Sequence, residues 1–169
     1  ESTPDVGSIF TFMVRMQVAK SQTVIAPRPT AALQNLRVLV ADDNPAARQI
    51  IQELFARLGM QADLADSGAK VIDRLCSAAD AGRPYDLLML DWKMPVLDGF
   101  ATLRQLRATA ANVPRPVTVM MTAYDLDECI QQGIGYDVGA FLSKPVDVER
   151  LQTTLNELFS ARASDAGGE

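Results

Sequence analysis

The segment that decides the fold is LDWKMPVLDG, residues 90–99. Its first aspartate, Asp91, directly follows the apolar run 87–90, which has the continuous hydrophobicity of a strand covered on both faces. A carboxylate at the end of a buried strand costs free energy unless another group pairs with it. We therefore expect Asp91 to have a partner. The Met-Pro and Asp-Gly pairs that follow predict a shaped loop and the start of a helix.

The composition fits a globular protein and removes several classes of function. The 169 residues are 48% hydrophobic and carry a net charge of −5, which disfavours nucleic acid and anionic membrane as partners. No apolar run reaches the ~18 residues of a membrane span, and the first residues do not resemble a signal peptide. The chain has no histidine, which excludes His-dependent triads, His-ligated zinc and phosphohistidine within it. Cys76 and Cys129 lie in apolar helical patterns, so we expect buried reduced thiols.

Alternating patterns predict five strand–helix units in an α/β fold. The expected strands cover residues 36–41, 61–65, 85–90, 116–123 and 139–143. Helices are expected after the N-cap Asn44, over 66–80, after Gly99, over 125–135 and after the cap Asp147. Strands that alternate with helices indicate a parallel sheet with right-handed crossovers and helices on both faces.

The two ends of the chain do not follow that pattern. Residues 20–35 contain prolines and small polar residues and are predicted to be a linker. Residues 161–169 are predicted to be a disordered tail, which leaves residues 36–160 as the folded domain. Before the linker, residues 7–18 alternate like a β-strand, which must pack on this domain or on another.

Polar side chains gather at the carboxyl ends of four expected strands. These are Asp42 and Asp43, Asp91, Thr122 and Lys144. Each could singly be a turn, cap or solvated residue, but the functional crevice of an open parallel sheet lies at this edge. Clustered carboxylates suit a hard cation such as Mg²⁺, which also relieves their mutual repulsion. The set predicts phosphoryl transfer to a carboxylate, with Asp91 as the candidate nucleophile.

These motifs resemble the receiver domain of two-component signalling, the chemotaxis-type response-regulator fold. The matching stretches are ADD (residues 41–43), LDWKMPVLDG (90–99), MTA (121–123) and FLSKP (141–145), and the match spans residues 36 to about 159. The resemblance implies a doubly wound, flavodoxin-like (βα)5 fold with strand order 2-1-3-4-5.

The resemblance also implies roles for individual residues. Asp91 corresponds to the phospho-acceptor, Asp42 and Asp43 to the acidic pair that binds Mg²⁺ (or Mn²⁺), and the main-chain carbonyl of Lys93 to a further metal ligand. Thr122 corresponds to the switch hydroxyl and Lys144 to the lysine that contacts the phosphoryl group.

The resemblance implies further features of the site. Phe141 falls at the aromatic switch position, although a core phenylalanine is an equal reading. The Lys144–Pro145 bond matches one that is cis in the family. Lys93 and Tyr124 occupy positions that tune loss of the phosphoryl group to water. We hypothesise that Tyr124 shields the phosphoaspartate; the alternative is that it faces partners.

Residues 1–19 resemble the closing strands of a histidine-kinase ATP-binding domain, with a Gly-Ser-x-Phe-x-Phe pattern. This resemblance implies the carboxyl end of a hybrid sensor kinase, cytoplasmic even if the parent kinase is anchored in a membrane. The expected partners are the kinase phosphodonor domain and a histidine phosphotransfer protein, with no nucleic acid and no direct membrane contact. The kinase boxes are absent from this chain, so it should not bind ATP or phosphorylate other proteins.

Two other functions are compatible with the fold. One is a phosphorylation-independent interaction module, against which the intact acidic, threonine and lysine positions weigh. The other is a flavodoxin-like mononucleotide binder. That function needs a Gly/Ser/Thr-rich loop after the first strand, where this chain has DDNP, which repels phosphate unless a metal is present.

Overall fold

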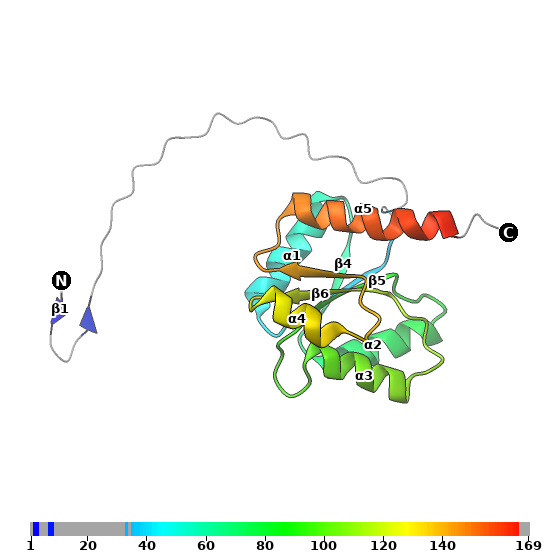
Figure 1. Ribbon diagram of the computed structural model, residues 1–169, viewed down its shortest axis with the longest axis horizontal. Helices are drawn as coiled ribbons and strands as arrows, with labels where there is room; N and C mark the ends of the chain where they lie inside the picture. The colour runs from blue at the N-terminus through cyan, green and yellow to red at the C-terminus, as the bar shows by residue number, and fades with distance from the viewer. Residues whose placement is uncertain (1, 4–6, 9–32, 34, 166–169) are drawn as a thin grey trace, which may run out of the picture.

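The computed structural model describes residues 2–3, 7–8, 33 and 35–165. Its main feature is a five-stranded parallel sheet with helices on both faces (Figure 1). The strands of this sheet are β3 (Val38–Ala41), β4 (Ala62–Ala65), β5 (Leu87–Asp91), β6 (Val117–Thr122) and β7 (Ala140–Ser143). The helices are α1 (Pro45–Arg57), α2 (Gly68–Asp80), α3 (Gly99–Thr109), α4 (Leu126–Gly133) and α5 (Val148–Asp165).

The strands lie in the order β4-β3-β5-β6-β7, all parallel. Counted along the chain, this is the predicted order 2-1-3-4-5, so the α/β doubly wound fold is confirmed. The sheet separates two hydrophobic cores, one on each face, and alternate residues of its strands point into one core or the other. Val38 and Val40 of β3 pack with α1 and α5, whereas Leu39 and Ala41 pack with α2, α3 and α4. The central strands β5 and β6 are buried along their whole length.

Local capping explains where the helices begin. The Asn44 side chain accepts hydrogen bonds from the main-chain N–H groups of Ala46 (2.9 Å) and Ala47 (3.4 Å), and Pro45 occupies the first helical position. Asp147 likewise accepts from the N–H of Arg150 (2.8 Å) at the start of α5. These caps are the ones that the sequence predicts.

The structure refines the expected ends of the domain. Leu33 lies within the predicted linker, yet it is completely buried in the core shared with α1 and α5. Helix α5 continues to Asp165, beyond the predicted boundary at residue 160. The paired strands β1 (Ser2–Thr3) and β2 (Gly7–Ser8) are antiparallel. Most of the strand-like segment 7–18, most of the linker and residues 166–169 lie outside the described residues.

Both cysteines are free thiols; Cys129 is buried and Cys76 is half-buried. Within the described part of the chain, no helix has the length and apolarity that crossing a bilayer requires.

Candidate active site

The first part of the site is the acidic turn, Asp42–Asn44, which joins β3 to α1. The main-chain N–H of Asp42 donates to the carbonyl of Ala65 (3.2 Å), which ties the end of β3 to β4. Asp42 Oδ1 accepts from the N–H of Asn44 (2.9 Å), and the next helix begins at once. Asp42 is buried and Asp43 is exposed. The turn therefore presents one buried and one solvated carboxylate at the carboxyl edge of the sheet.

The second part is Asp91, the last residue of β5. The loop after it is fixed at both ends, because Trp92 N–H donates to Met121 O (2.8 Å) and Gly99 N–H donates to Trp92 O (2.8 Å). A Cβ at Gly99 would lie 2.7 Å from the Asp91 carbonyl oxygen, so only glycine fits where α3 starts. Asp98 caps α3 through the N–H of Ala101 (2.7 Å). The loop thus holds Asp91 rigidly at the strand end.

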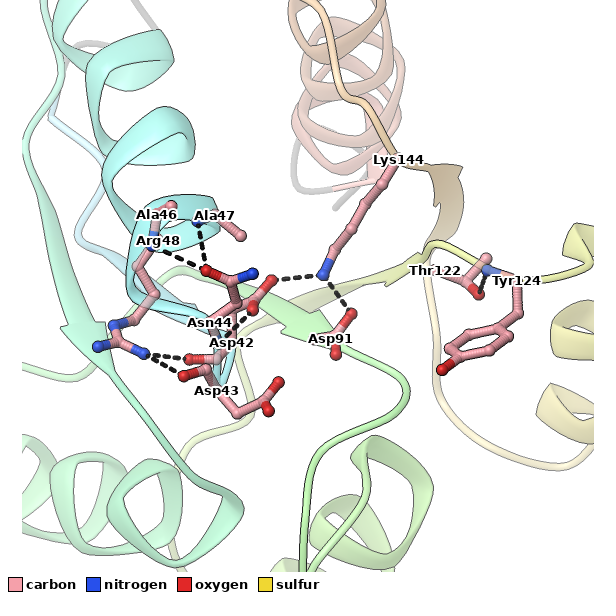
Figure 2. Close-up of polar contacts among 10 residues, drawn as sticks. All are labelled: Asp42, Asp43, Asn44, Ala46, Ala47, Arg48, Asp91, Thr122, Tyr124 and Lys144. Atoms are coloured by element: carbon pink, nitrogen blue, oxygen red, sulfur yellow. Dashed lines mark hydrogen bonds and ion pairs between the residues drawn. The ribbon is translucent and has the colours of Figure 1, made fainter. Parts of the chain in front are cut away.

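The structure brings the three predicted carboxylates together. One oxygen from each of Asp42, Asp43 and Asp91 lies within 4.8 Å of the other two. Lys144 extends from the end of β7 between two of them and binds Asp42 Oδ2 and Asp91 Oδ1, the latter at 2.5 Å (Figure 2). Two oxygens bound to one Mg²⁺ at ~2.1 Å are at most about 4.2 Å apart. Small rotations of the side chains would bring these carboxylate oxygens, now within 4.8 Å, to that spacing.

Burial and the neighbouring charges both shift the pKa of Asp91. Burial raises the pKa of Asp91, the contact with Lys144 lowers it, and repulsion from Asp42 and Asp43 raises it further. The sequence predicts only the repulsion between the clustered carboxylates, whereas burial is the largest influence on the pKa of Asp91 in the structure. Burial alone would lower the pKa of Lys144, but Asp42 and Asp91 outweigh it and raise that pKa. Lys144 therefore remains charged and supplies the positive charge next to Asp91.

Thr122 and Phe141 lie on the neighbouring strands β6 and β7. The buried Thr122 hydroxyl oxygen accepts from the N–H of Tyr124 (2.9 Å), and Lys144 N–H donates to the Thr122 carbonyl (2.7 Å). The Lys144–Pro145 bond is cis, as the resemblance implies. Phe141 is half-buried and packs against the core of α2, α3 and α4. Its ring fills the space above Gly133 at the end of α4.

Lys93 and Tyr124, the residues at the two tuning positions, each contact the ring of Trp92. The Lys93 ammonium lies 3.8 Å from the centroid of the Trp92 ring, and Tyr124 packs edge-on against that ring with centroids 6.3 Å apart. Trp92 is fully buried, whereas Tyr124 is 64% exposed. The Lys93 side chain therefore stacks on an aromatic face beside Asp91.

Two contributors to the site were missed by the reasoning from sequence. Trp92 directly follows Asp91, and a tryptophan at a strand end reads as a core residue. Arg48 sits in the first turn of α1, where an arginine reads as a solvated charge. Its guanidinium instead contacts the main chain of the acidic turn (Figure 2). Neither contact follows from a local pattern.

The fold, together with the acidic cluster and the lysine at the carboxyl ends of its strands, defines the class of the protein. The family model of the response regulator receiver domain matches residues 38–156, and the chain belongs to that family.

Similar proteins include sensor proteins and isolated receiver domains. The sensor protein EvgS of Escherichia coli K12 is 27% identical over 161 residues, which are 94% of this chain and 13% of EvgS. The sensory/regulatory protein RpfC of Xanthomonas campestris is 32% identical over 132 residues, 78% of this chain and 18% of RpfC. The chain thus spans less than a fifth of either relative.

Solved receiver domains share the fold. The receiver domain of the histidine kinase CKI1 from Arabidopsis thaliana, complexed with Mg²⁺ and BeF₃⁻, has a TM-score of 0.65 and 25% identity, covering 76% of this chain and 92% of that one. The Vibrio cholerae chemotaxis protein CheY4 has a TM-score of 0.59 and 26% identity, covering 73% of this chain and 98% of that one.

Proposed function

We propose that this chain is a phospho-accepting receiver domain of a phosphorelay, in which Asp91 takes a phosphoryl group from a kinase phosphohistidine. The observation that carries the proposal is the convergence of Asp42, Asp43 and Asp91, whose oxygens lie within 4.8 Å of one another, with Lys144 bound to two of them. Because these groups come from three separate strand ends, their meeting is a property of the fold and not of one local turn.

The donor set fits a hard divalent cation. Asp42, Asp43, Asp91 and the main-chain carbonyl of Lys93 would hold Mg²⁺ or Mn²⁺. When bound, the cation neutralises part of the charge on the carboxylates and on the transferred phosphoryl group. The CKI1 receiver domain, to which this chain is similar, was solved in complex with Mg²⁺ and BeF₃⁻, which supports the proposal of a divalent cation.

The side chains of this protein carry out the transfer. An Asp91 oxygen attacks phosphorus, a P–O bond forms as the P–N bond to histidine breaks, and the imidazole leaves with the bonding electron pair. The Lys144 ammonium and the Thr122 hydroxyl bind phosphoryl oxygens and share the charge that spreads over them. The raised pKa of Lys144 keeps its nitrogen protonated for this role.

Phosphorylation then acts as a switch. Thr122 moves toward the new charge, and Phe141 follows into the space that Thr122 leaves, which repacks the face of α4 and β7. Tyr124 and Lys93 set the lifetime of the phosphoryl group. We expect the Tyr124 ring to limit water access because it is anchored edge-on against Trp92.

The parent protein is proposed to be a hybrid sensor histidine kinase. The match to EvgS covers 94% of this chain and therefore includes most of residues 1–32, which precede the buried Leu33. Residues 1–19 would be the end of the kinase ATP-binding domain and residues 20–35 a linker. The phosphodonor is then a histidine of the same parent chain, the onward acceptor is a histidine phosphotransfer protein, and the compartment is the cytoplasm.

The test is incubation of the chain with Mg²⁺ and a small-molecule phosphodonor, followed by intact mass spectrometry. Wild type should gain a single acid-stable, base-labile phosphoryl group, and Asp91→Asn should gain none. Asp73→Asn, which removes an exposed carboxylate on α2, serves as the matched control and should behave as wild type. Chelation of Mg²⁺ should abolish the gain. A wild-type chain that stays unmodified would contradict the proposal and favour an interaction module.

The same reaction tests the role of Tyr124. Tyr124→Ala should shorten the half-life of the phosphorylated chain several-fold. An unchanged half-life would assign the exposed ring to partner contact instead.

A further inference from the structure

Arg48 binds the main chain of the acidic turn. Its Nη1 donates to the carbonyl oxygen of Asp42 (2.7 Å) and to that of Asp43 (3.0 Å). The residue is half-buried in the first turn of α1, and its guanidinium lies on the side of the turn away from Asp91 and Lys144 (Figure 2). One side-chain nitrogen therefore ties down two consecutive peptide carbonyls.

These two carbonyls belong to Asp42 and Asp43, two of the residues whose carboxylates would hold the proposed cation. Fixing a peptide carbonyl fixes the backbone dihedrals on either side of it, and these dihedrals set the direction of the side chain. The Asp42 carboxylate has further anchors in Asn44 N–H and Lys144. Asp43 is exposed, so the direction of its carboxylate depends more on its main chain.

We propose that Arg48 is a positioning residue for the cation site: by binding the carbonyls of Asp42 and Asp43, it holds both carboxylates toward Asp91. The inference rests on the proposed function, since it concerns the cation that the phospho-acceptor site uses. Groups that orient metal ligands without touching the metal contribute substantially to affinity, and their loss typically costs 10–100-fold.

The positive charge of Arg48 allows an effect of charge on Mg²⁺ affinity to be told apart from an effect of positioning. A cationic guanidinium near a cation site disfavours the cation by repulsion, so its removal would tighten Mg²⁺ binding if charge were its only effect. If Arg48 positions the ligands, its removal weakens Mg²⁺ binding. The two roles therefore predict changes of opposite sign in Kd.

The experiment measures the Kd for Mg²⁺ of the full 169-residue chain by calorimetry. Fluorescence of Trp92, the single tryptophan and the neighbour of Asp91, serves as a second signal. Arg48→Met keeps the length of the side chain but removes donor and charge, and its Kd should rise by about tenfold. Arg48→Lys keeps the charge and one donor group, and its Kd should lie between those of wild type and Arg48→Met. Arg57→Met removes an exposed arginine from the last turn of the same helix and should leave the Kd within about twofold of the wild-type value.

Thermal unfolding separates positioning from a general effect on the fold. A folded Arg48→Met variant with unchanged or tighter Mg²⁺ binding would overturn the inference while leaving the proposed function intact. If wild type itself binds no Mg²⁺, the proposed function fails and the inference fails with it. Should Arg48→Met not fold, Arg48→Gln, which keeps a short uncharged donor, carries the same expectation of weaker binding.

Discussion

At the scale of the residue, Tyr85 shows how one buried tyrosine links stability to pH. Tyr85 lies at the amino edge of the sheet, donates to Asp63 Oδ2 (2.7 Å) and has the Arg37 guanidinium 4.5 Å from its ring centroid. Burial, followed by the contact with Asp63, raises the pKa of Tyr85 above its ordinary value of 10.0. The folded state therefore favours the neutral phenol.

This shift has a predictable sign. As pH rises through ~10, the unfolded chain releases the tyrosine proton before the folded chain does, so the free energy of unfolding falls. Tyr85→Phe should cost about 1 kcal/mol near pH 7 through the lost hydrogen bond, and this deficit relative to wild type should shrink above pH ~10. Urea unfolding at both pH values measures it, with Tyr124→Phe, at an exposed position, as the control. A deficit that stays constant with pH would contradict the prediction.

At the scale of the element, the end of α4 and strand β7 depend on one glycine. A Cβ at Gly133 would lie 2.4 Å from Phe141 Cζ, closer than any real contact, so the absence of a side chain is what admits the ring. Phe141 thus packs against the end of α4 in this structure, and its movement as a switch residue stays a prediction. The same contact makes α4 sensitive to any movement of Phe141.

The contact predicts a reversal of the usual glycine effect. Replacing glycine by alanine within a helix ordinarily stabilises by about 0.5–1 kcal/mol, but Gly133→Ala should destabilise by about 1–3 kcal/mol through overpacking. Phe141→Leu should relieve the clash, so in a double-mutant cycle the two changes should be strongly non-additive. Urea midpoints for the four proteins provide the measurement. Stabilisation by Gly133→Ala would show that the ring is free to leave.

At the scale of the whole molecule, the folded unit begins earlier than its first strand. Leu33 is completely buried among the residues that pack between the sheet and helices α1 and α5, and its carbonyl accepts from Leu36 N–H (3.4 Å). A chain that begins at residue 36 should therefore be less stable than one that begins at residue 30, by about 2–4 kcal/mol, the usual cost of an emptied leucine site. Chemical denaturation of the two chains tests this. Leu33→Ala in the full chain should reproduce most of the loss, and equal stability of the two shortened chains would place Leu33 outside the core.

The order of strands and helices, and the polar residue at each strand end, could be predicted because both are local. Continuous apolar runs identify β5 and β6, while Asn44, Asp98 and Asp147 cap helices through bonds to residues two or three positions away. The parallel order of the sheet follows from the alternation of elements and from the family resemblance. The ends of the domain were less predictable, since a single leucine before β3 carries no periodicity.

The sequence by itself therefore determined the fold and the candidate residues Asp42, Asp43, Asp91, Thr122 and Lys144, because patterning and capping act between near neighbours. Tertiary structure alone decided how these groups meet. The bridge of Lys144 to Asp42 and Asp91, the edge-on contact of Tyr124 with Trp92, and the burial that is the largest cause of the raised pKa of Asp91 all depend on packing between separate elements. The hydrogen bonds from Arg48 to the main chain of the acidic turn depend on the rotamer of its side chain, which no local sequence pattern encodes.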